Sequence, residues 1–150
     1  MAARGFTLAE IFIVLVIAGI IVAIVTPAIE NHVQRSRVGQ CIVDLTEMSE
    51  TIRKREKDTG ALAEALSDVG YASKLDPWGN PYEYINLRTL NGNGQARKDK
   101  NLKPLNSDFD LYSIGRDGQT MASLTHARSR DDVVRARDGR FIGTVEEFDP

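Results

Sequence analysis

One carboxylate, Glu10, stands at the start of an uncharged run that covers residues 11–29. A run of about 19 residues without charge is long enough to cross a bilayer as a helix. A carboxylate at membrane depth costs about 2.5–3.5 kcal/mol, so it indicates a positively charged partner. A cut between Gly5 and Phe6 would place a new amine four residues before Glu10, on the same helix face. We predict that Glu10 pairs with this amine, in its own chain or in a neighbouring subunit.

The sequence G-F-T-L-x-E at residues 5–10, followed by a long apolar helix, resembles the N-terminus of type IV pilins and of type II secretion pseudopilins. In that family a prepilin peptidase cuts after the glycine and methylates the new N-terminus, and mature subunits polymerise into a helical filament. The resemblance implies that Gly5 is the cleavage-site residue, Phe6 the methylated N-terminus and Glu10 the assembly carboxylate.

Two simpler interpretations of residues 1–29 are a cleaved signal peptide and a plain membrane anchor. A signal peptide needs a basic n-region, a shorter apolar segment and a small-residue cleavage site after it. Here Arg4 is the only basic residue before the apolar run, the run is longer, and no Ala-x-Ala sequence ends it. A plain anchor gives no reason for Glu10. We therefore favour the pilin-like interpretation.

The composition excludes several other functions. The 150 residues include 19 basic and 21 acidic residues, and loss of residues 1–5 would change the net charge from −2 to −3. This mild balance argues against nucleic acid as a main partner. Cys41 is the only cysteine, so no intrachain disulfide can form. The sequence contains no P-loop and no G-x-S-x-G motif, and we predict that the chain is not an enzyme.

The first helix is predicted to continue well beyond the membrane. Apolar residues recur at three- and four-residue steps, which is typical of one buried helix face, at Val38, Cys41, Ile42, Leu45, Met48 and Ile52. Residues 58–60, Asp-Thr-Gly, are the predicted stop. Gly19 and Pro27 weaken the helical hydrogen bonding of the apolar half. Pilin-family filaments lose helix in such a Gly-to-Pro segment on packing, and the resemblance implies the same for residues 19–27.

After residue 60 the pattern changes to short elements. We predict a brief helix at 62–69, strands at 82–85 and 109–114, and a last short strand at 141–142. The polar residues 88–107, including the basic stretch from Arg97 to Lys103, are predicted to form an exposed loop. The result is an α+β fold: a long N-terminal helix packed on a small antiparallel β-sheet, with a loop-rich C-terminal tail. The predicted segments are a leader (1–5), a transmembrane and assembly helix (6–29), an amphipathic stem (30–60) and a C-terminal globular domain (61–150).

A second resemblance narrows the family. The strings D-P-W-G-N-P-Y at 76–82, D-L-Y-S-I-G at 110–115 and D-G at 117–118 are similar to those of the major, G-type pseudopilin of type II protein secretion. This implies a homopolymer that works with prepilin peptidase, an inner-membrane assembly platform and minor pseudopilins. It also implies a single-pass precursor in the bacterial inner membrane and a periplasmic or extracellular filament after assembly.

Two alternatives to a secretion pseudopilin remain open at this point. Residues 88–107 and 120–130 look longer than the corresponding stretches of secretion pseudopilins, so a surface type IV pilus subunit for adhesion, motility or DNA uptake is one alternative. A monomeric, membrane-anchored calcium-binding module is the alternative from another class. Such a module would still function if Glu10 were replaced, whereas a filament subunit without Glu10 would not assemble.

The resemblance also implies a calcium site. In major pseudopilins the C-terminal loop binds calcium through aspartates and main-chain carbonyls; Asp117 matches the D-G turn, and Asp131 and Asp132 resemble the later acidic pair. Calcium takes six to eight oxygen ligands. A bound calcium ion would therefore order the C-terminal tail, which has no disulfide to do so. From the residues alone, Asp131 and Asp132 could instead begin a helical turn at 133–136, and no EF-hand spacing is present.

Overall fold

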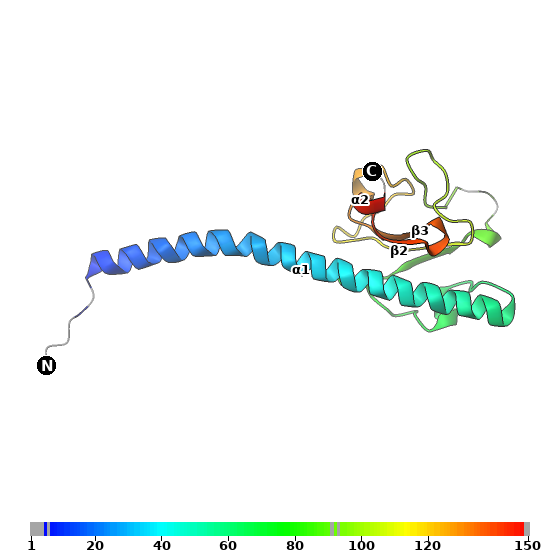
Figure 1. Cartoon of the computed structure of the whole chain (residues 1–150), viewed down its shortest axis with the longest axis horizontal. Coiled ribbons are helices and arrows are strands. Elements are labelled where there is room, and N and C mark those ends of the chain that lie inside the picture. Colours follow the sequence, from blue (N-terminus) through cyan, green and yellow to red (C-terminus); the bar gives the residue numbers. More distant parts are fainter. Residues whose placement is uncertain (1–4, 6, 91, 93, 149–150) are drawn as a thin grey trace. The chain divides into compact units, whose positions relative to one another are not determined.

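The computed structural model describes residues 5, 7–90, 92 and 94–148. The chain divides into two units, Met1–Ser36 and Arg37–Pro150, each with its own internal contacts. Helix α1, Leu8–Thr59, supplies all the helix of the first unit and the first element of the second (Figure 1). The predicted N-terminus Phe6 and residues 1–4 of the predicted leader lie outside the described residues.

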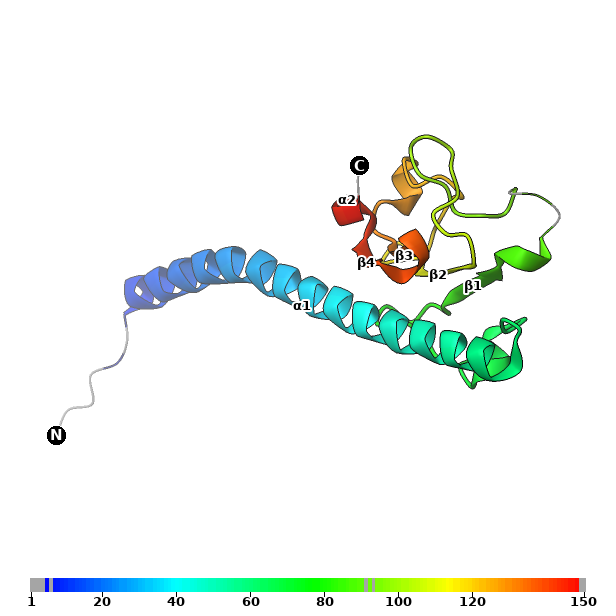
Figure 2. The ribbon, with the colours of Figure 1, turned by 45° about the vertical axis from the view of Figure 1, so that its right-hand side comes forward.

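The second unit contains one antiparallel sheet in which each strand pairs with the next along the chain (Figure 2). The strands are β1 (Glu83–Asn86), β2 (Phe109–Ser113), β3 (Val133–Ala136) and β4 (Phe141–Thr144). The pairing places Tyr84 opposite Leu111 and Tyr112 opposite Val134. The short helical elements are η1 (Leu66–Val69), η2 (Leu87–Thr89), η3 (Ala127–Ser129), η4 (Arg137–Gly139) and α2 (Val145–Phe148).

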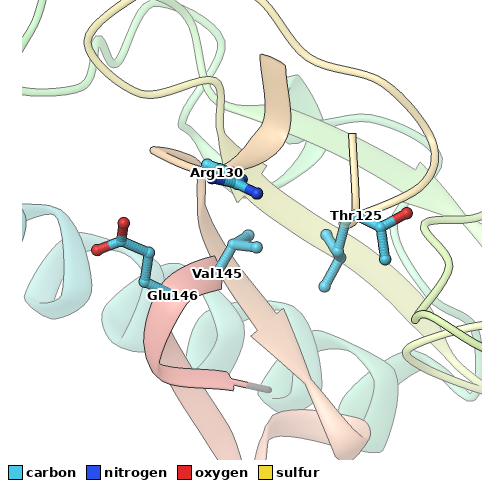
Figure 3. Close-up of a pocket in the computed structure, with 5 residues that line it drawn as sticks. Thr125, Arg130, Val145 and Glu146 are labelled. Carbon is cyan, nitrogen blue, oxygen red and sulfur yellow. The ribbon is translucent and has the colours of Figure 1, made fainter. Parts of the chain in front are cut away.

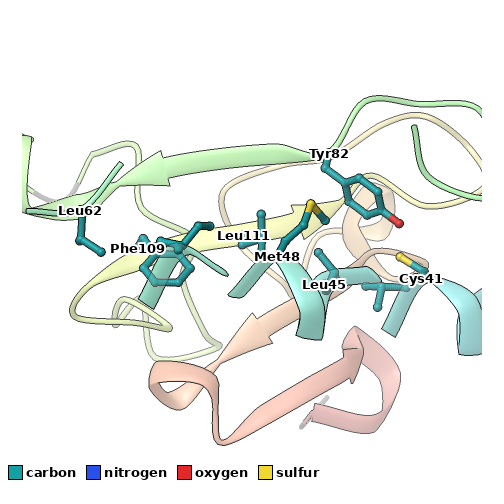
Figure 4. Close-up of a cluster of buried hydrophobic side chains, with 9 residues drawn as sticks. Cys41, Leu45, Met48, Leu62, Tyr82, Phe109 and Leu111 are labelled. Carbon is teal, nitrogen blue, oxygen red and sulfur yellow. The ribbon is translucent and has the colours of Figure 1, made fainter. Parts of the chain in front are cut away.

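One face of the sheet packs on the last part of α1, from residue 37 onward. The predicted stripe is confirmed there, because Cys41, Leu45, Met48 and Ile52 are fully buried. They contact Leu62, Tyr82, Phe109, Leu111 and Val133 (Figure 4). Burial of each such aliphatic side chain contributes about 1.5–3 kcal/mol. The helix ends at Thr59, and Gly60 adopts a φ of 78°, which suits glycine at the residue after a helix.

The other face of the sheet carries a second, smaller core. Its buried members come from the strands, the long loops and α2: Leu105, Tyr112, Leu124, Val134, Ala136 and Val145. The predicted exposed loop at 88–107 is therefore wrong at four positions, although residues 100–104 and 107 are exposed as predicted. Ala96, Arg97, Leu105 and Asn106 are all buried, because residues on this side must cover the outward face of β2 and β3.

The fold class is confirmed, and two local expectations are corrected. Residues 133–136 form strand β3 and not a helical turn, because all four pair with β4. Four residues rich in Val suit a strand better than an isolated turn of helix. The brief helix predicted at 62–69 is reduced to η1, four residues of 3-10 helix that end at Val69 and are followed by Gly70.

Candidate functional site

Glu10 lies in the first turn of α1 and is bound there by Thr7. The Thr7 backbone N–H donates to Glu10 Oε2 at 2.7 Å and the Thr7 hydroxyl donates to the same oxygen at 2.9 Å. The Glu10 N–H donates back to the Thr7 hydroxyl at 3.3 Å. This reciprocal pair is a capping box, whose signature Thr-x-x-Glu was present in the sequence and was missed. Glu10 thus has a local structural partner besides the predicted Phe6 amine.

Gly19 and Pro27 both lie within α1, which continues past them without a break. Proline cannot donate a backbone hydrogen bond, so the carbonyl four residues earlier, on Ala23, loses its helical partner. At the residue before Pro27, the Thr26 hydroxyl donates to the Val22 carbonyl at 2.7 Å. The loss of helix at residues 19–27 concerns the assembled state and stays a prediction.

The first half of α1 presents an apolar surface. Its large side chains are exposed, for example Leu8 at 89% and Ile24 at 68%. Within the described part of the chain, α1 is the one helix long and apolar enough to cross a membrane by length and composition. Glu10 stands at the N-terminal end of this surface.

The motif at residues 76–82 forms a closed turn. The Asp76 N–H donates to the Asn80 carbonyl at 2.7 Å, and Leu75 bridges to Pro81. The Asn80 side chain donates to the Gly115 carbonyl at 2.9 Å. The turn is thereby attached to the Gly115–Gly118 turn that follows β2, which explains why the two strings occur together in one chain.

Cys41 lies beside Tyr82 and Asp44 in the first core. Burial raises the pKa of its thiol to about 12, so the thiolate needed for nucleophilic attack does not form near neutral pH. Asp44 accepts the Tyr82 hydroxyl at 2.9 Å and pairs with Lys74 Nζ at 3.0 Å. Cys41 is therefore a packed apolar side chain.

A cavity of about 430 Å³ lies beside α2 (Figure 3). It is lined by Leu124, Thr125, Arg130, Val145 and Glu146. This lining includes one carboxylate and one guanidinium but no His, Cys or Ser. Thr125 contributes the one hydroxyl side chain of this lining.

The structure brings together two of the three predicted calcium ligands. Asp131 Oδ2 accepts the Asp117 backbone N–H at 2.9 Å, and Asp117 Oδ1 accepts the Gln119 N–H at 2.8 Å. Asp132, in contrast, is completely buried and forms an ion pair with Arg97. Among residues 5, 7–90, 92 and 94–148, no three His, Cys, Asp or Glu side chains gather as a metal-binding group. The three aspartates as arranged do not fit one calcium ion, and calcium binding stays a prediction.

Sequence reasoning missed the two buried arginines. Arg135 donates to both oxygens of Asp108, at 2.8 and 2.7 Å, and its Nε donates to the Ser49 hydroxyl at 3.0 Å. Its guanidinium lies 3.8 Å from the centre of the Phe109 ring. β3 is thereby joined to α1 and to the start of β2. The signal exists only once residues 133–136 are placed in a strand, where the buried residues 133, 134 and 136 leave Arg135 on a buried face as well.

Comparison with known proteins identifies the family. The chain is 31% identical to type II secretion system core protein G of Pseudomonas aeruginosa, over 77% of this chain and 84% of that protein. Proteins of the same name from Aeromonas hydrophila and Escherichia coli are each 26% identical over 77% of this chain, and the matches cover 84% and 83% of those proteins. No family model and no solved structure matches the chain. The long apolar helix, the antiparallel sheet and this similarity lead to one conclusion: the chain belongs to the G-type pseudopilin family, the core protein G family of type II secretion systems.

Proposed function

We propose that the chain is the major structural subunit of a type II secretion pseudopilus and that it polymerises through α1. The similarity to the P. aeruginosa protein, over 84% of its length, supports this function. The observation that carries the proposal is the exposed apolar surface of α1 with a single carboxylate, Glu10, at its start. A membrane-anchored module would need the apolar surface but would have no use for Glu10 at its start.

The apolar half of α1 requires a cover at every stage. Burying a side chain such as Ile or Leu is worth about 1.5–3 kcal/mol relative to water, and many such side chains are exposed between Leu8 and Ile29. Lipid of the inner membrane covers them in the precursor, and neighbouring α1 helices cover them in the filament. Subunits therefore reside in the inner membrane before they enter the filament.

Glu10 favours the filament over the membrane-embedded subunit. Lipid tails are as apolar as leucine, so moving a helix from lipid into a filament gains little hydrophobic free energy. A carboxylate in lipid costs about 2.5–3.5 kcal/mol, and pairing with the Phe6 amine of a neighbouring subunit relieves this cost. Such a contact joins two different surfaces of identical chains, and a repeated contact of this kind generates an open helical filament.

The proposal includes the processing and the partners that assembly needs. A prepilin peptidase cuts between Gly5 and Phe6, which creates the amine that Glu10 requires. The assembly platform in the inner membrane and the minor pseudopilins are the protein partners, and a separate ATPase supplies the energy for extension. The role of the chain itself is structural and not catalytic.

The decisive experiment is the mass of the N-terminal peptide of native protein purified from membranes. We expect a peptide that begins at Phe6 and carries one extra methyl group. A peptide beginning at Met1 would leave a plain anchored domain, and one beginning after Thr26 would show a cleaved signal peptide. In parallel, deletion of the gene should abolish export of secreted enzymes. Normal export together with lost surface filaments would point to a surface pilus.

A further inference from the structure

Arg97 lies at the centre of the tail although it comes from the loop between β1 and β2. Its side chain is 2% exposed and forms an ion pair with Asp132, whose side chain is completely buried. It also donates to the Thr120 hydroxyl, which in turn donates to Asp132 Oδ2 at 2.6 Å. The guanidinium stacks 4.4 Å from the centre of the Tyr112 ring. One cation therefore connects three segments that are far apart in the sequence.

The backbone around Arg97 fixes the position of this cation. The Arg97 N–H donates to Asp110 Oδ2 at 2.7 Å, and the Leu105 N–H donates to the Arg97 carbonyl at 2.9 Å. The neighbouring Lys98 exchanges backbone hydrogen bonds with residues 122 and 124, at 2.7 and 3.0 Å. The backbone at Arg97 and Lys98 is thus hydrogen bonded to its surroundings, and the buried Arg97 side chain is not a mobile surface charge.

The ion pair leaves two buried atoms without hydrogen bonds among the described residues, Arg97 Nε and Asp132 Oδ1. One is a donor and the other an acceptor, and both belong to the same pair. Arginine and carboxylate commonly pair through two parallel hydrogen bonds. Arg97 Nε and Asp132 Oδ1 are therefore a donor and an acceptor of the kind that complete such a two-bond pair.

We propose that Arg97 performs the role that the family resemblance assigns to calcium: it is a built-in cation that holds residues 120–132 against β2, and the tail folds without metal. A guanidinium bonded to a carboxylate oxygen repels a second cation at that oxygen. Calcium also needs several free carboxylate oxygens, and Asp132 has lost one to Arg97 and Thr120. Arg97 lies in residues 88–107, which look longer than the corresponding stretch of secretion pseudopilins. The additional residues therefore supply the cation that holds residues 120–132 in place.

The first test is thermal unfolding of the full-length protein in detergent, with millimolar calcium and with EGTA. We expect the same Tm under both conditions. A Tm that rises with calcium in the wild type would overturn the proposal. This measurement needs no variant and does not depend on filament assembly. Its result therefore tests the role of Arg97 separately from the proposed function.

Variants of the pair give the second test. Arg97→Met leaves Asp132 buried and unpaired, and the Tm should fall by roughly 10 °C or more. Adding Asp132→Leu should recover part of that loss, because both charges are then gone. Arg116→Met, an exposed arginine in the neighbouring turn, is the matched control and should leave the Tm unchanged. Equal Tm values for Arg97→Met and Arg116→Met would refute the proposal that Arg97 holds residues 120–132. If Arg97→Met does not fold, Arg97→Lys is measured instead and should retain most of the stability.

Discussion

Asp76 and Ser113 share a buried hydrogen bond of 2.6 Å, in which the Ser113 hydroxyl donates to Asp76 Oδ2. The other oxygen, Oδ1, accepts the backbone N–H groups of Trp78 and Asn80 at 3.0 and 2.8 Å. One carboxylate therefore closes the turn at 76–80 and fixes it to the last residue of β2. This arrangement gives a physical reason for an aspartate at the start of the D-P-W-G-N-P-Y string.

The first prediction concerns this carboxylate. Asp76→Ala removes the acceptor for two N–H groups and a hydroxyl, and buried donors without acceptors are costly. We expect the free energy of unfolding to fall by roughly 2–4 kcal/mol. Denaturant unfolding of the full-length protein in detergent measures this. Asp58→Asn, at an exposed helix position, is the control and should change little; equal effects of the two substitutions would contradict the interpretation.

The second prediction concerns acid stability through the Asp108–Arg135 pair. Burial by itself would raise the pKa of Asp108, but the hydrogen bonds and charge of Arg135 outweigh burial and lower it. A carboxyl with a lowered folded-state pKa stabilises the fold above its unfolded pKa of about 3.9. That contribution is lost as the pH falls through the folded-state value. We therefore expect stability to decline below about pH 4, as measured by Tm against pH.

Two variants separate this pair from the other carboxyl groups. Asp108→Asn should lower the Tm at pH 7 and flatten its decline in acid, because the titrating group is gone. Arg135→Met leaves Asp108 partly buried and paired with the more exposed Arg53 at 3.3 Å. This should cost up to about 3 kcal/mol at pH 7 and less at low pH, where Asp108 is protonated. An unchanged acid profile in Asp108→Asn would assign the decline to another group.

The parts of the fold that were predictable from sequence have local causes. The buried stripe from Cys41 to Ile52 follows from helical periodicity, and the end of α1 at Thr59 follows from the glycine after it. The strands at 83–86 and 109–113 lie within one residue of the predicted bounds, because each contains aromatic and aliphatic residues that suit a sheet.

The parts that were not predictable depend on distant residues. Arg97 lies in an Arg-Lys-Asp-Lys stretch that reads as a solvated loop, and its burial is decided by Asp132, 35 residues later. The strand at 133–136 is too short to show a period, and its pairing with β4 decides its conformation. The capping role of Glu10, in contrast, was available in the sequence as Thr-x-x-Glu and was missed.

The third prediction concerns Pro27. Pro27→Ala restores a backbone donor and should make residues 19–27 more helical, by about 3 kcal/mol on propensity scales. If this segment loses helix on assembly, as the pilin resemblance implies, the variant should enter membranes normally but form fewer filaments. The measurement is the ratio of sheared filament to membrane-bound subunit. Wild-type filament yield from Pro27→Ala would argue that the segment stays helical.

The fourth prediction separates the two roles of Glu10. The structure shows Glu10 capping α1 through Thr7 at 2.7–3.3 Å, whereas the proposed function requires its charge. Glu10→Gln keeps the capping box, since glutamine can serve at this position, and removes the charge. Thr7→Val keeps the charge and removes the cap hydroxyl, at a cost of about 1 kcal/mol to the helix end.

We expect Glu10→Gln to abolish filaments, as Glu10→Ala should, while Thr7→Val reduces them only modestly. All three proteins should still be found in the membrane, because residues 11–29 are unchanged. Sheared filaments and membrane-bound subunit are measured together for each variant. The opposite order, with Thr7→Val more severe than Glu10→Gln, would mean that the order of the first helical turn controls assembly. Charge neutralisation between Glu10 and the new N-terminus would then not be the driving contact.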